Sequence, residues 1–80
     1  MKITQADYDA LKQSLTSLVP QAKAHREYII AEGKSKDIER RLRWDMLNAS
    51  GYDVLRRLYA YLNDSHIDTA LRAIMAELGV

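Results

Sequence analysis

The spacing of the helix-breaking residues is the feature that most constrains how this chain folds. The only proline is Pro20, and the only glycines are Gly33, Gly51 and Gly79. Because isolated glycines and prolines typically mark helix ends, these four residues divide the 80-residue chain into segments of helix length. Apolar residues recur within the segments at helical spacing, and no segment shows the alternation of a strand. The sequence predicts one all-α domain over residues 1–80, a compact bundle of four to five short helices.

The first two predicted helices meet at Pro20. Thr4 precedes Asp7 by three residues, which resembles a capping box with Asp in place of Glu or Gln. An apolar stripe follows it: Tyr8, Leu11, Leu15, Leu18 and Val19. Pro20 either ends or kinks this helix, and it also suits the first turn of a second helix over residues 20–32. Gly33 is a natural end for that second helix.

Three further helices are predicted after Gly33. The third is expected from the capping residue Ser35 to Ala49, with a main stripe of Ile38, Leu42, Met46 and Ala49. The fourth, over residues 52–62, is apolar around about half its circumference, so we expect it at the centre of the bundle. The fifth is expected to begin at Ser65, with Asp68 completing a second capping-box-like pair, and to stop at Gly79.

Composition excludes several classes of protein. The chain has no cysteine, which removes disulfides, thiol catalysis and thiolate metal sites together. Its apolar runs are only a few residues long, whereas a transmembrane helix needs about 20. Residues 1–13 contain no apolar run typical of a signal peptide. We therefore expect a cytoplasmic protein without a membrane partner.

No motif in the chain indicates catalysis or metal binding. The glycines are isolated, so they form no phosphate-binding loop. His25 is expected to be a half-buried helix residue, and neither histidine has a spacing typical of a catalytic arrangement. Asp64, His66 and Asp68 are spaced by two residues, and such positions on a helix point about 200° apart. We expect no enzyme activity, no metal, no cofactor and no small-molecule substrate.

A basic segment suggests nucleic-acid binding as one alternative. Net charge is only +1, which is low for a nucleic-acid binder, but residues 23–43 carry seven cations against four anions. Asp37 and Glu39 interrupt the segment, and Asp37 is spaced to pair with Arg41, so a solvated, salt-bridged face is the favoured interpretation. A helix-turn-helix from the last two helices is disfavoured, because Asp64 and Asp68 would repel phosphate. The candidate nucleic-acid patch is Lys34, Lys36, Arg40, Arg41 and Arg43.

The leading functional prediction comes from the opposite side of the third helix. Trp44 and Leu47 lie opposite its main stripe and are flanked by Arg40 and Arg43. Tryptophan beside arginine is typical of interface hot spots. These four residues are the candidate surface of a protein–protein interaction module, with a homodimer as one form of it. The favoured interpretation of Trp44 and Leu47 themselves is nevertheless that they are core residues of a helix packed on both sides, because most tryptophans in so small a protein belong to the core.

Two strings in the chain resemble those of a known group of proteins. Residues 36–47 (KDIERRLRWDML) and 58–71 (LYAYLNDSHIDTAL) resemble small phage and prophage open reading frames, which carry similar R-W-D-x-L and Y-L-N-D-x-H-I-D-T-A-L strings. The resemblance covers about half of the chain. It implies an origin in a bacterial mobile element and brings no activity, because that group is itself of unknown function. It also suggests a structural role for the second string, in which Asp64 or Ser65 caps the fifth helix and Asp68 closes its first turn.

Overall fold

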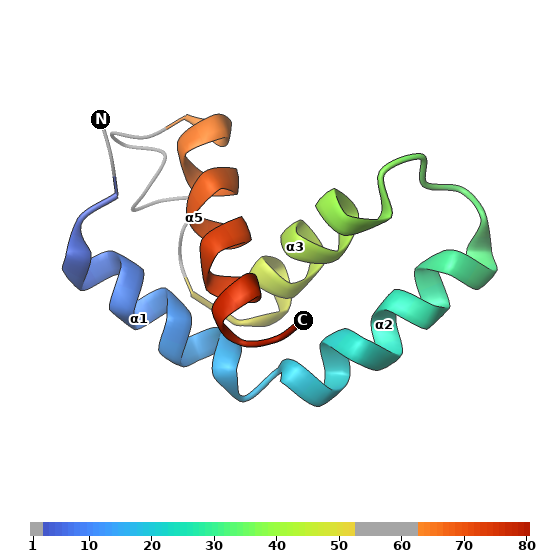
Figure 1. Ribbon diagram of the computed structural model, residues 1–80, viewed down its shortest axis with the longest axis horizontal. Helices are drawn as coiled ribbons and strands as arrows, with labels where there is room; N and C mark the ends of the chain where they lie inside the picture. The colour runs from blue at the N-terminus through green and yellow to red at the C-terminus, as the bar shows by residue number, and fades with distance from the viewer. Residues whose placement is uncertain (1–2, 53–62) are drawn as a thin grey trace.

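Four helices make up the part of the chain that the computed structural model describes, residues 3–52 and 63–80. They are α1 (Gln5–Thr16), α2 (Val19–Glu32), α3 (Ile38–Ala49) and α5 (Asp64–Glu77). In Figure 1, α1 and α2 meet end to end at an angle, and α3 and α5 lie within that angle. The described ranges contain no strand, so the predicted all-α bundle is confirmed. The fourth helix was predicted over residues 52–62, and all of it except its first residue lies outside the described residues. The same holds for the first helix of the helix-turn-helix considered above.

The signals around α1 and α2 act as the sequence predicts. The Thr4 hydroxyl accepts a hydrogen bond from the backbone N–H of Asp7 (3.2 Å) and donates one to its carboxylate (3.0 Å). α1 ends at Thr16, and α2 begins at Val19 with Pro20 in its first turn, so the two are separate helices. Gly33 ends α2 with a left-handed φ of 69°, a conformation that glycine adopts without steric cost.

The predicted start of α3 at Ser35 is wrong. The helix begins at Ile38, because the Asp37 carboxylate accepts a hydrogen bond from the backbone N–H of Arg40 (3.0 Å) and caps it. The Ser35 hydroxyl has a different partner, since it accepts a hydrogen bond from the guanidinium of Arg41 (3.0 Å). Ser35 therefore lies in the connection that leads to α3.

The predicted caps of α5 are also wrong. The side chain of Asn63 caps this helix by accepting a hydrogen bond from the backbone N–H of His66 (3.1 Å). Asp64 and Ser65 are already helical residues. Asp68 closes no first turn, because its carboxylate points toward α3 and pairs there with an arginine. Gly79 follows the helix with a φ of 75°, as expected of a stop.

The apolar stripes of all four helices meet in one core. α3 packs against both α2 and α5, so two of its faces are buried. Leu47 is accordingly 2% exposed, whereas Ala49, expected in the main stripe, is exposed. Burying each large apolar side chain contributes about 1.5–3 kcal/mol. The buried apolar residues are Leu11, Leu15, Ala22, Ile29, Leu42, Met46, Leu47, Ile67, Ala70, Leu71, Ile74 and Met75.

Among the described helices, none has both the length and the apolar character needed to cross a membrane.

Candidate interaction surface on helix α3

The structure divides the four residues of the candidate partner surface into two pairs. Leu47 is buried in the core, and Arg43 is only 8% exposed. Arg40 is exposed and Trp44 is half-buried, with its inner part packed against the core. The surface that remains available on this side of α3 is therefore built around Arg40 and Trp44.

Arg43 is buried and forms a bidentate ion pair with Asp68 of α5. Its Nε lies 2.9 Å from Asp68 Oδ1 and its Nη2 lies 3.1 Å from Asp68 Oδ2, with side-chain exposures of 10% and 9%. Arg72 donates a further hydrogen bond to Asp68 (3.1 Å) from the solvent side. The fork of a guanidinium matches a carboxylate in this geometry, so the pair fixes α3 against α5.

The charges around Asp68 control its ionisation. Burial by itself raises the pKa of the Asp68 carboxyl, but the hydrogen bonds and charge of Arg43 lower it, and Arg72 adds to that effect. The net result is a pKa below the ordinary value of an aspartate. Asp68 is therefore a carboxylate that pairs with two arginines, one on α3 and one on its own helix.

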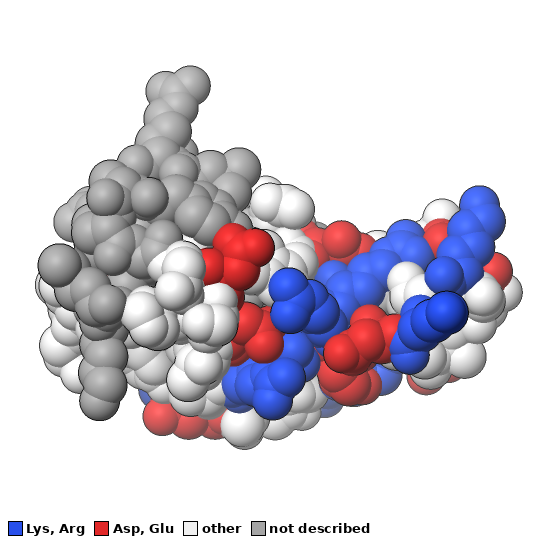
Figure 2. Space-filling view, turned by 90° about the horizontal axis from the view of Figure 1, so that it is seen from above, with Lys and Arg blue, Asp and Glu red and all other residues white. Residues whose placement is uncertain are grey.

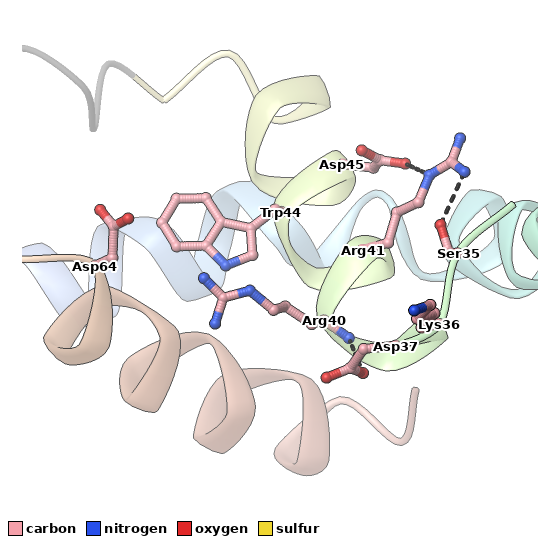
Figure 3. A pocket seen from close by; sticks show the side chains of 8 residues that line it. All are labelled: Ser35, Lys36, Asp37, Arg40, Arg41, Trp44, Asp45 and Asp64. Atoms are coloured by element: carbon pink, nitrogen blue, oxygen red, sulfur yellow. Dashed lines mark hydrogen bonds and ion pairs between the residues drawn. The ribbon is translucent and has the colours of Figure 1, made fainter.

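A shallow groove of about 430 Å³ runs along the N-terminal half of α3 (Figure 3). The first residue of α5, Asp64, stands at one end, and the segment that leads into α3 stands at the other. Trp44 lies between them and forms the apolar part of the floor. The lining residues are Ser35, Lys36, Asp37, Arg40, Arg41, Trp44, Asp45 and Asp64.

One wall of the groove is fixed by ion pairs between α2 and α3. Arg41 binds both oxygens of Glu32 (2.6 and 3.2 Å) and lies 3.4 Å from Asp45. Asp45 in turn lies 2.7 Å from Nε2 of His25. The hydrogen bond from Arg41, followed by its charge, outweighs burial and holds the pKa of Glu32 below its ordinary value. The charged groups named here are therefore already engaged within the protein.

The ion pairs in this wall differ in part from those predicted for His25 and Arg41. His25 is half-buried on α2, as predicted, and it also has a carboxylate partner on α3 that the sequence did not identify. The predicted pair between Asp37 and Arg41 is wrong, because the Asp37 carboxylate caps α3 and Arg41 turns to Glu32. Such partners come from different helices, and helical spacing within one segment does not reveal them.

The opposite side of the groove carries groups with unused hydrogen-bonding capacity. Within residues 3–52 and 63–80, no carboxylate lies at ion-pair distance from Lys36 or Arg40. Nε1 of Trp44 is buried and has no acceptor in the same part of the chain. Figure 3 shows the guanidinium of Arg40 beside the indole ring of Trp44. The exposed guanidinium of Arg40 is therefore the group on this side that an acceptor from a partner can reach.

The five residues of the candidate nucleic-acid patch are not equally available. Lys34, Lys36 and Arg40 are exposed, whereas Arg41 and Arg43 are held in ion pairs. Figure 2 shows carboxylates interleaved with the cations on this face instead of a continuous basic patch. Three cations are therefore left for contact with phosphate.

No family model, curated protein or solved structure matches this chain. The phage or prophage origin that the two sequence strings suggest stays a prediction.

Proposed function

We propose that this chain is a small, non-catalytic protein–protein interaction module that binds its partner in the groove of α3. The proposal rests on one observation, the juxtaposition in an open groove of the Trp44 indole with Arg40, which has no ion-pair partner among the described residues. Tryptophan and arginine are the residues most enriched among interface hot spots, because they combine large contact area with directional hydrogen bonds. An acceptor from a partner meets the exposed guanidinium of Arg40 here, next to the aromatic surface of Trp44.

The fixed wall of the groove supports tight and selective contact. Arg41 is bound by Glu32 and Asp45 from two helices, so this wall is already ordered before a partner arrives. Association then loses less conformational entropy than it would with a mobile wall. Arg40 supplies a charge-assisted hydrogen bond, which contributes about 1.5–3 kcal/mol when its partner is fully formed.

The chemistry of the groove supports a binding role over catalysis. Its lining contains no histidine and no thiol. The one hydroxyl among the lining residues, on Ser35, accepts its hydrogen bond from the Arg41 guanidinium, which cannot act as a base. The carboxylates of Asp37 and Asp45 are occupied by a helix cap and by ion pairs.

A photo-crosslinking experiment tests the proposed function. A benzophenone amino acid replaces Lys36 in the groove, and a control protein carries it at Lys23, an exposed residue of α2. Both are irradiated in extract from the native cells, and adducts are identified by mass spectrometry. We expect one protein that crosslinks from position 36 and not from position 23. This crosslink should disappear when the chain also carries Arg40→Glu.

A second measurement tests whether the captured protein binds in the groove. Trp44 is the only tryptophan, so its indole N–H gives a single resonance in ¹⁵N NMR spectra. Titration with the purified partner should shift this resonance in a saturable way. If no crosslinked protein moves it, and the chain itself at high concentration does not move it either, the groove is no protein-binding site.

Nucleic-acid binding is the second candidate, favoured by three exposed cations that have no ion-pair partner within residues 3–52 and 63–80: Lys34, Lys36 and Arg40. With three phosphates neutralised, the slope of log K against log salt should be about −2.7 for a DNA duplex and about −2.1 for a single strand. A short DNA duplex and a single-stranded RNA, titrated at low salt against the same indole resonance, provide the comparison. Saturable binding with the corresponding slope, and no protein partner, would replace the protein-binding proposal by this one.

A further inference from the structure

The charged groups that line the α3 groove balance one another in number. A surface of this kind does not attract a polyanion over long range, because its opposite charges cancel with distance. A partner is therefore recognised here by single contacts and not by total charge. The lining holds three cations and three carboxylates, namely Lys36, Arg40, Arg41, Asp37, Asp45 and Asp64.

Half of these charges are already engaged within the protein, by the ion pairs of the fixed wall and by the cap of α3. The other three have no ion-pair partner within residues 3–52 and 63–80: Lys36, Arg40 and Asp64. Two of these three are cations. The groups that remain available in the groove thus favour one negative charge from a partner over one positive charge.

The positions of Arg40 and Trp44 set the spacing of the groups that can bind. The two residues are four positions apart on α3, so they lie on the same face, about 6 Å apart along the helix axis. Figure 3 shows the Arg40 guanidinium beside the Trp44 indole. A guanidinium fork matches a carboxylate, and an indole ring matches an apolar group. A partner that uses both must carry its carboxylate close to an apolar side chain.

We propose that the partner segment in this groove carries an aspartate or glutamate beside a large apolar side chain. The carboxylate pairs with the Arg40 guanidinium, and the apolar side chain covers Trp44. The inference rests on the proposed function, since it names the chemistry of the partner of the same groove. A carboxylate is favoured over a phosphate group, because the lining carboxylates Asp37 and Asp64 repel a group of nearly two negative charges more strongly than a group of one.

The other exposed or hollow apolar regions offer less to a partner of defined chemistry. Tyr28 and Ile30 of α2 are 58% and 51% exposed, but they are two positions apart on a helix, so their side chains point about 200° apart and form no shared patch. A second hollow lies between α1 and α5, and the described residues that line it include no Lys, Arg, Asp or Glu. They are Ile3, Tyr8, His66, Thr69, Ala70 and Ala73.

Four small probes that share a phenyl ring and differ in one group test this chemistry on the full chain. They are 3-phenylpropionate, its neutral amide 3-phenylpropionamide, 2-phenylethylammonium and phenyl phosphate. Each is titrated at neutral pH against the Trp44 indole N–H resonance. Ligands of this size typically reach dissociation constants of about 1–10 mM. The acid should bind in that range. The amide, the ammonium and the phosphate should each bind about three- to tenfold more weakly.

Variants of Arg40 show whether the preference for the acid comes from its guanidinium. Arg40→Gln should bind the acid and the amide equally, and Arg40→Lys should keep only part of the preference, because an ammonium has charge without the fork. Lys23→Gln removes the same charge at an exposed position of α2 outside the groove lining, and it should behave like wild type. Unchanged binding of the amide in all three variants shows that the groove is intact.

Four results would overturn the proposed chemistry. The first is equal binding of acid and amide to wild type, and the second is a preference for the acid that survives in Arg40→Gln. The third is tighter binding of phenyl phosphate, which would favour the nucleic-acid candidate. The fourth is no shift with any probe up to about 50 mM, well above the expected dissociation constants. If the acid is not preferred but the captured protein still shifts the Trp44 resonance, the proposed function stands and only the chemistry of its segment is wrong. If neither the probes nor any protein shifts it, both proposals fail.

Discussion

Replacing Asp68 by asparagine should remove a large part of the stability of this protein. Asp68→Asn leaves the Arg43 guanidinium buried without its countercharge, in a site where the two side chains are only 10% and 9% exposed. Removing one partner of a buried ion pair typically costs about 3–5 kcal/mol. At about 0.05–0.15 kcal/mol per residue, a chain of 80 residues has only about 4–12 kcal/mol to lose. We expect a loss of about 3 kcal/mol, since Arg43 has some access to solvent.

Urea denaturation followed by circular dichroism measures this loss, with two variants for comparison. Arg72→Gln removes the outer partner of Asp68, whose side chain is 66% exposed, and should cost no more than about 0.5 kcal/mol. The double variant Arg43→Met with Asp68→Leu replaces the pair by apolar groups and should recover most of the loss. If Asp68→Asn costs no more than Arg72→Gln, the buried pair does not fix α3 against α5.

Three further predictions follow from the same structure. The folded-state pKa of Asp68 is lowered, so the stability that its charge contributes is complete above the unfolded-state pKa of about 3.9 and is lost as the pH falls through the folded-state pKa. Urea titrations between neutral pH and about pH 3 should show that loss in wild type and a smaller loss in Asp68→Asn. Leu47→Ala should lower the free energy of unfolding by about 2–5 kcal/mol, whereas Asn48→Ala, next to it but exposed, should stay within about 0.5 kcal/mol; equal effects would mean that Leu47 is not core. Thr4→Ala should cost about 1 kcal/mol by removing the cap of α1, and an unchanged urea midpoint would contradict that role.

Helix ends were predictable where the signal is local and has no competitor. Thr4 and Gly33 act through backbone groups within a few residues, so sequence spacing alone identifies them. The predicted cap of α3 was Ser35, whereas the observed cap is Asp37. The choice depended on Arg41, which engages the Ser35 hydroxyl and leaves Asp37 to cap the helix.

Longer-range partners explain the remaining differences at the site. Arg43 and Asp68 are 25 positions apart and meet only because α3 packs on α5, so Asp68 was assigned to a cap instead of an ion pair. Leu47 could be assigned to the core or to a partner surface, because helical periodicity gives one stripe, whereas a helix between two neighbours buries two. Trp44 and Arg40 were singled out by residue type, and only the fold shows that they share a groove with Asp64.

The indole resonance of Trp44, titrated with the protein captured by crosslinking at position 36, tests the central claim most directly. The claim is that the groove around Arg40 and Trp44 is a binding surface, and this resonance reports from its floor. We predict a saturable shift in wild type and no shift in Arg40→Glu. A resonance that stays fixed in wild type, or that moves equally in both proteins, would contradict the account.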